Sequence, residues 1–197
     1  MTKRLNLLLE DNLIPIFFSL LQHGFMVKAE VGCSIKAFLC EQLGVSPEYL
    51  EDRIQTLFLD GKPVDDVNSA IIEHGSTLAL SAAMPGFLGA TLRKGSYYAA
   101  MRSEISYKKE TESGPVQEGT VFLKLFNLLL GELGPAFLKQ GIWLDGKILE
   151  DFFKSQSNDF WAGCKSARLN GERIDPDRLP GMNWANEQVF LQVQESS

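Results

Sequence analysis

The chain has 197 residues, 45% of them hydrophobic and 22% charged, with a net charge of −6 and a pI near 5.0. This composition is typical of a globular protein and excludes the collagen-like, disordered and coiled-coil classes. The acidic balance disfavours a nucleic-acid partner, because proteins that bind duplexes normally carry a basic surplus.

The N-terminus and the cysteines do not indicate secretion or a membrane. Polar residues 10–12 interrupt the first apolar run before a signal-peptide core is complete. The next run, residues 13–25, is shorter than the about 20 residues that span a bilayer. Three scattered cysteines without a CxxC pair do not form a disulfide framework or a zinc site. We expect a cytoplasmic protein with free thiols, no metal, no cofactor and no membrane contact.

Local signals in the first half predict alternating strands and helices. Residues 1–11 are compatible with a strand or with an extension of the helix that follows. Asn12 and Gly24 favour the start and end of that helix, over residues 13–23. Alternating apolar residues then predict a strand over residues 25–31.

Two capped helices and a hairpin are expected next. Ser34 and Ser46 are predicted N-caps, the second followed by a first-turn proline. A strand over residues 55–59 ends at Asp60-Gly61, a two-residue turn signal because both positions require a positive φ. Pro63 makes the return strand an edge strand, since proline cannot donate to a sheet ladder. The half closes with a short helix and a strand, expected at residues 66–74 and 76–82.

The second half repeats the first weakly. The matching segments are 3–24 with 120–141, 32–42 with 146–156, and 59–65 with 169–175. Such self-similarity is typical of structural repeats, with chance agreement among Leu and Gly residues as the alternative. The expected domains are residues 1–92, a connector or added strand at 93–118, and a second, divergent domain at 119–197.

Residues 25–86 resemble the ubiquitin-like β-grasp fold, which includes ubiquitin and the sulfur carriers of thiamin and molybdopterin synthesis. The resemblance lies in the order of elements and in three stretches, Gly44-Val-Ser-Pro-Glu, Leu57-Phe-Leu-Asp-Gly-Lys-Pro-Val and His74-Gly-Ser-Thr-Leu-Ala-Leu. It implies an α+β fold with two tandem β-grasp-like units joined by a connector. The carriers end on Gly-Gly, whereas this chain continues beyond Gly86, so the resemblance does not imply their carboxylate chemistry. A β-grasp also opens with a hairpin, and here a helix separates the first two strands.

Residues 85–102 combine glycines, cations and tyrosines. Backbone N–H groups at glycines can point at an anion, basic side chains supply charge, and tyrosines can stack on a ring. The order Lys-Gly-Ser is not that of a P-loop. The alternative is a crossover that ends in a strand over residues 97–107. The candidate ligand-binding residues are Gly86, Gly89, Arg93, Lys94, Gly95, Tyr97, Tyr98 and Arg102.

Two further sets of residues could carry chemistry. Cys33 is a candidate reactive thiol, because it precedes a helix cap and a helix N-terminus can lower a thiol pKa. No partner base is assigned to it from the sequence. Asp60, Asp65 and Asp66 are interpreted as solvated turn acids rather than a cation site, because the EF-hand pattern is missing from the sequence.

We predict a non-catalytic protein-interaction or adaptor module that uses sheet edges and the glycine-rich segment. Its partner would be another protein. Because each unit alone is small, we expect the two units to pack together or the protein to form a homodimer, which would hide apolar surface. The alternative function is binding of a small anion or a nucleotide phosphate by residues 85–102. A thiol enzyme that uses Cys33 is the third hypothesis, so an enzymatic role is less expected than a binding role.

Overall fold

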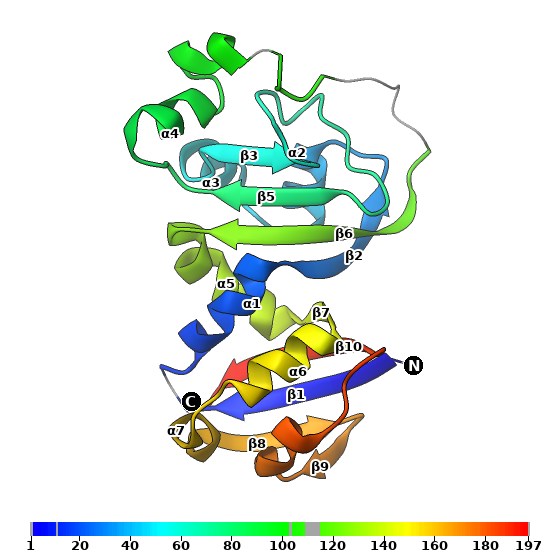
Figure 1. The fold of residues 1–197 in the computed structure, drawn as a ribbon. Coiled ribbons are helices and arrows are strands. Elements are labelled where there is room, and N and C mark those ends of the chain that lie inside the picture. The colour runs from blue at the N-terminus through cyan, green and yellow to red at the C-terminus, as the bar shows by residue number, and fades with distance from the viewer. Residues whose placement is uncertain (1, 11, 103, 109–114, 197) are drawn as a thin grey trace. The chain divides into compact units, whose positions relative to one another are not determined.

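A computed structural model describes residues 2–10, 12–102, 104–108 and 115–196 of the chain (Figure 1). The backbone divides into two compact units. Unit 1 comprises Met1–Phe25 and Leu130–Ser197, and unit 2 comprises Met26–Leu129. Both units combine helices with a sheet, which confirms the α+β class. The domains expected from the sequence, residues 1–92 and 119–197 with a connector between them, are not tested by this division and stay a prediction.

Unit 2 contains a sheet with the strand order β4-β3-β5-β6-β2. Strand β3 is antiparallel to β4 and β5, and β5 is parallel to β6. In chain order the elements are β2 (Phe25–Val31), α2 (Ile35–Ala37), the π-helical turn η2 (Phe38–Gln42), α3 (Pro47–Asp52), β3 (Thr56–Leu59), β4 (Lys62–Pro63), β5 (Thr77–Ser81), α4 (Gly86–Leu92), the 3-10 helix η3 (Tyr97–Arg102) and β6 (Gln117–Phe126).

The caps and the hairpin of unit 2 confirm the sequence-based predictions. The Ser34 hydroxyl accepts the N–H of Ala37, and the Ser46 hydroxyl accepts the N–H of Tyr49. In the turn between β3 and β4 the φ angles are 50° at Asp60 and 78° at its glycine. The two-residue return strand β4 lies at the sheet edge, where its proline is tolerated.

The helix expected over residues 66–74 is wrong. The Asp66 carboxylate accepts the backbone N–H of Asn68, which offers the backbone a turn instead of a helix. Further on, Ile72 donates its N–H to the carbonyl of Cys33 and accepts the N–H of Gly32. The segment is therefore held as turns and extended chain beside the start of α2.

Unit 1 has the strand order β7-β10-β1-β8-β9. Strand β1 is parallel to β10 and antiparallel to β8, so residues 2–9 form a strand and not a helical extension. In chain order the elements are β1 (Thr2–Leu9), the 3-10 helix η1 (Ile14–Phe17), α1 (Phe18–His23), α5 (Leu128–Gln140), β7 (Ile142–Asp145), α6 (Gly146–Lys154), α7 (Asn158–Ala162), β8 (Cys164–Leu169), β9 (Glu172–Ile174), the 3-10 helix η4 (Pro176–Gly181) and β10 (Gln188–Glu195).

The predicted N-cap at Asn12 is wrong. Asn12 has a φ of 76°, and the helical region begins with the 3-10 turn η1. Leu13 stands at the cap position and makes no side-chain hydrogen bond there. The positive φ at Asn12 reverses the chain after β1 instead, a conformation that asparagine tolerates better than most residues.

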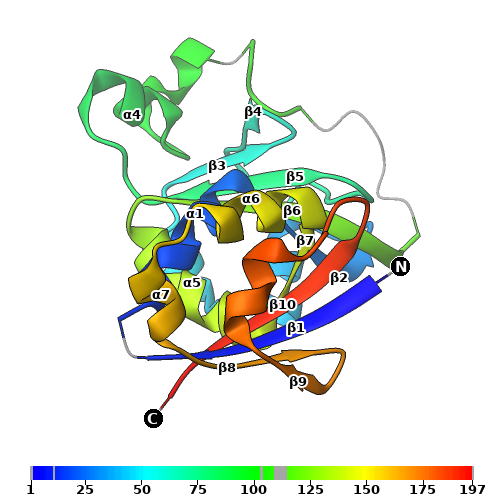
Figure 2. The ribbon, with the colours of Figure 1, turned by 60° about the horizontal axis from the view of Figure 1, so that its bottom comes forward.

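Helices cover one face of the sheet of unit 1 (Figure 2). Between the sheet and the helices lies a core of aromatic rings, in which Phe152 of α6 is 4.9 Å from Phe17 and 6.3 Å from Phe160, measured between ring centroids. Phe153 contacts the fully buried Trp184 at 5.9 Å. The opposite face of this sheet is mixed: it carries polar side chains such as Asn6 and Gln192 as well as Leu8 and Phe190.

Candidate functional site

The glycine-rich segment forms a small lobe of unit 2. Helix α4 and the 3-10 helix η3 lie next to each other and, together with residues 104–107, make up what we call the α4–η3 lobe. The strand expected over residues 97–107 is wrong, since Tyr97–Arg102 are helical. The predicted ligand-binding residues therefore lie together on this lobe, apart from any sheet.

A buried arginine anchors the lobe. Arg102 is only 3% exposed. Its Nη1 and Nη2 donate to the two carboxylate oxygens of Asp65 at 3.1 and 2.8 Å. The remaining donors bind the carbonyls of Thr91 (2.7 Å) and Arg93 (3.3 Å) and the hydroxyl of Ser106 (2.7 Å). Because all of its nitrogens bind within the protein, Arg102 closes the lobe onto the body of unit 2.

Two other candidates also bind within unit 2. Lys94 donates from Nζ to the carbonyl of Leu50 at 2.7 Å and lies 3.4 Å from the carboxylate of Glu51. The N–H of Gly95 points to Asp65 at 3.3 Å. The groups that were expected to face an external anion thus contact acids and carbonyls of the same chain.

The other candidates are spread over the lobe. Gly89 is buried, and a Cβ there would lie 2.1 Å from the carbonyl oxygen of Met84, so this glycine allows two backbone segments to approach closely. Gly86, Arg93, Tyr97 and Tyr98 are exposed. Anion binding by these residues stays a prediction, and the geometry gives it no convergent set of donors.

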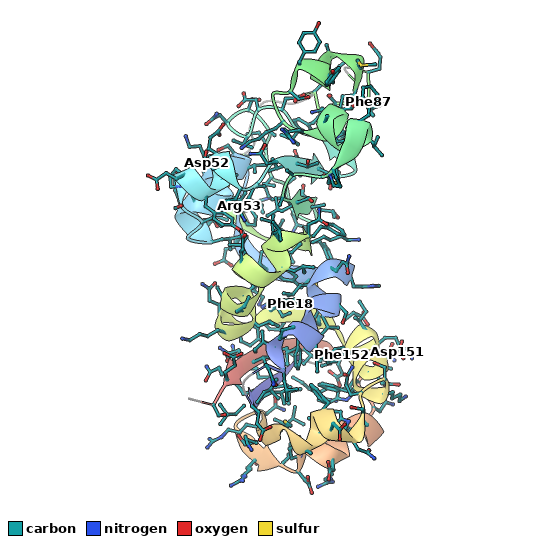
Figure 3. All side chains as sticks on the ribbon, turned by 90° about the vertical axis from the view of Figure 1, so that its left-hand side faces the viewer. Phe18, Asp52, Arg53, Phe87, Asp151 and Phe152 are labelled. Atoms are coloured by element: carbon teal, nitrogen blue, oxygen red, sulfur yellow. The ribbon has the colours of Figure 1, made fainter. Side chains whose placement is uncertain are left out.

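The lobe instead presents apolar side chains to solvent. Figure 3 marks Phe87 on α4. The exposed fractions are 63% for Phe87, 70% for Leu88, 92% for Tyr97, 68% for Met101 and 60% for Ile105. Tyr98 connects this set, because its ring centroid is 5.4 Å from those of both Phe87 and Tyr97.

The thiol groups are poorly activated. Burial raises the pKa of the Cys33 thiol; hydrogen bonds, one of them from Gln42, lower it in part, and the carboxylates of Glu41 and Glu30 add smaller increases. Burial also raises the pKa of Cys164, to about 11. A raised pKa lowers the fraction of thiolate at neutral pH, which is the opposite of what a nucleophile requires.

The acids of the hairpin region stabilise turns. Asp60 accepts the N–H of Thr77 at 2.7 Å, and Asp65 binds Arg102. Hydrogen bonds from Asn68 and Ser69 lower the pKa of Asp66. Across the described residues, no three His, Cys, Asp or Glu side chains are grouped so that they could hold a metal ion.

Sequence reasoning missed the partner of Arg102 and the exposure of the apolar residues. Asp65 is 37 positions away from Arg102, so no local pattern connects them. The run of apolar residues between 87 and 105 was the available signal, since a lobe this small cannot bury them all.

No protein-family model, curated protein or solved structure matches this chain. None of the helices in the described ranges combines the length and apolarity that a bilayer crossing requires. The function of the protein therefore has to be inferred from its own residues.

Proposed function

We propose that the protein is a non-catalytic protein-interaction module and that the α4–η3 lobe is its principal contact surface. The observation that supports this is the group of five large apolar side chains in the lobe that are at least 60% exposed. Contiguous exposed apolar surface is uncommon on monomeric proteins and typically marks a binding surface.

The residue types of the lobe support a protein partner. Tyr, Phe and Met are enriched at protein interfaces, and buried aromatic anchors contribute most of the binding free energy. The edge-to-face contacts of Tyr98 with Phe87 and Tyr97 hold the rings in a defined arrangement before binding. The buried Arg102 restricts the lobe as a whole, which lowers the entropy cost of association.

Strand addition at the sheet edges receives less support. The edge strand β4 has two residues, one of them Pro63, and the edge strand β9 has three. Such short edges offer few unpaired backbone groups to an added strand. The lobe is therefore the better candidate for the contact surface.

The test is a quantitative comparison of proteins cross-linked to three forms of the full chain. One form carries Phe87→Ser, Tyr97→Ser and Met101→Ser on the lobe. The control carries Val116→Ser and Leu128→Ser, which remove apolar side chains of similar exposure elsewhere, at 59% and 61%. We expect partners of the wild type to be lost with the first form and kept with the control. Equal capture by all three forms would contradict the proposal.

We also propose that the chain consists of two β-grasp-like repeats that have exchanged their first strands. The order of elements supports this: a strand and a helix, a second strand, two helices, a hairpin and a last strand occur in β1–β5 and again in β6–β10. Both hairpins turn at two positive-φ residues, Asp60-Gly61 and Asn170-Gly171. Strand β1 pairs with β10 and β8, and β6 pairs with β5. The first strand of each half thus completes the sheet of the other.

A further inference from the structure

The open face of the sheet of unit 1 carries a row of polar side chains. Along β1 the buried residues Leu5, Leu7 and Leu9 belong to the core, so the intervening side chains, including that of Asn6, lie on the opposite face.

Strand register then places Gln192 of β10, Asn6 of β1, Arg168 of β8 and Arg173 of β9 side by side. We call this row, together with Arg4 beside it on β1, the arginine face. It spans four neighbouring strands of one sheet (Figure 2).

The charges of this face are unbalanced. Arg168 and Arg173 are paired directly across antiparallel strands, where like charges destabilise a sheet. The flanking rows, Trp143–Phe190–Arg4 and Gln194–Leu8–Ser166, contain no carboxylate. Glu172 and Asp175 are the acids nearest to Arg173 along the chain, but in the described residues neither forms an ion pair with the two arginines, and Asp175 caps η4 instead.

Several other cations of unit 1 have acidic partners. Lys147 and Lys154 are paired with Asp151 and Glu150 within α6, and Lys165 is paired with Glu10. In the described part of the chain, by contrast, the guanidinium groups of Arg168 and Arg173 have neither an ion pair nor a hydrogen bond, and both side chains are exposed.

A hollow with mixed lining adjoins the row. It has a volume of about 490 Å³ and is lined by Asn6, Leu8, Ser166, Arg168 and the glutamines 192 and 194. Asn6 donates to the side-chain carbonyl of Gln192 at 2.7 Å, which orders the amides at its centre. The lining thus offers a cation, a hydroxyl and amides beside the apolar residues Leu7 and Leu8.

We propose that the arginine face binds an extended acidic segment of a partner protein. The inference rests on the proposed function as a protein-interaction module, but it uses a surface of unit 1 and not the lobe. Alternate side chains of an extended chain project to the same side about 7 Å apart, and neighbouring strands lie about 5 Å apart. Acidic residues at alternate positions can therefore reach both Arg168 and Arg173, with guanidinium–carboxylate bonds that relieve the repulsion between them.

A single-stranded nucleic acid suits the face less well. Base stacking needs a free aromatic surface. Phe190 already contacts Trp143 at 5.0 Å, Arg4 lies over its ring, and its ring edge occupies the space that a Cβ at Gly141 would need. The net charge of −6 also opposes the long-range attraction on which nucleic-acid binding depends.

The experiment measures fluorescence anisotropy with the full chain and a labelled peptide of alternating Glu and Ser, ten residues long, at low salt. We expect saturable binding that weakens as salt is added. Arg168→Gln with Arg173→Gln should raise the Kd by about tenfold or more. Arg178→Gln is the control. It removes an exposed cation from η4, which contacts helix α6 on the other side of the sheet, and it should leave the Kd unchanged.

Three results would overturn the inference: no binding of the peptide, equal weakening by Arg178→Gln, or tighter arginine-dependent binding of a ten-residue uridine oligonucleotide. The double variant should melt no lower than the wild type, because it loses the repulsion between two like charges. The triple lobe variant that includes Phe87→Ser distinguishes the proposal for the α4–η3 lobe from the proposal for the arginine face. If it captures the same partners while the arginine variant loses the peptide, only the lobe proposal fails.

Discussion

At the scale of single residues, the buried side chain of Arg102 holds the α4–η3 lobe against the rest of unit 2. A guanidinium that is 3% exposed is tolerated only when its donors are bonded, and here they bind Asp65, two carbonyls and a hydroxyl. These bonds hold η3 against the hairpin region of unit 2. The lobe owes its defined conformation to this contact and to the hydrogen bonds of Lys94 and Gly95, because most of its apolar side chains face solvent.

Asp65→Asn should destabilise the protein by about 1–3 kcal/mol, since the buried Arg102 loses its carboxylate partner, whose side chain is 40% exposed. The measurement is urea unfolding together with limited proteolysis, which should cut first between residues 86 and 107. Arg93→Gln is the control, because the side chain of Arg93 is exposed. A stability equal to that of the wild type in Asp65→Asn would contradict the anchoring role of Arg102.

At the scale of elements, helix α6 begins where two segments approach closely. Gly146 follows the capping residue Asp145 directly, and its N–H donates to the carbonyl of Glu187 at 2.8 Å. A Cβ at position 146 would lie 1.9 Å from the carbonyl oxygen of Trp184. The start of α6 and the segment before β10 can therefore meet only at a glycine.

Gly146→Ala should lower the free energy of unfolding by about 2 kcal/mol or more, because the backbone must shift to admit the methyl group. Gly131→Ala, in helix α5, is the matched substitution: apart from its chain neighbours and the helix's own backbone, no atom lies within 4 Å of a Cβ built there, and we expect a gain of roughly 0.5–1 kcal/mol. Both values follow from urea unfolding curves. Equal effects of the two substitutions would show that close approach is not the cause.

At the scale of the whole molecule, the two halves of the chain depend on each other for strands. The first strand, β1, is the parallel neighbour of the last, β10, and β6 is the parallel neighbour of β5. A chain cut between the halves would leave each sheet without a central strand. Parallel pairing between strands far apart in the chain slows folding, because the entropy cost of loop closure has to be met before the strands can contact each other.

We expect fragments 1–108 and 115–197 to fold poorly alone and to recover native far-UV circular dichroism and cooperative melting when mixed. The complex should contain one copy of each fragment by native mass spectrometry. Fragment 1–108 includes β1 and β5 but lacks their parallel partners. If that fragment melts cooperatively as a monomer, strands β6 and β10 are not required for the folding of the first half.

The sequence by itself determined the local features. The serine caps, the Asp60-Gly61 turn and the edge position around Pro63 depend on groups a few residues apart, so their chemistry is visible in the chain. The helix expected at 66–74 failed because the Asp66 side chain competes for a backbone N–H and the segment bonds to residues near 33.

Only the tertiary structure decided which strands are neighbours. Asn6 and Gln192 are 186 positions apart and meet only because β1 and β10 are neighbours, whereas Arg168 and Arg173 are placed opposite each other by the Asn170-Gly171 hairpin. The alternation in each strand assigns its residues to two faces, but every strand edge offers the same backbone donors and acceptors. Which edges pair, and therefore which strands lie beside the two arginines of the β8–β9 hairpin, is set by packing across the whole fold.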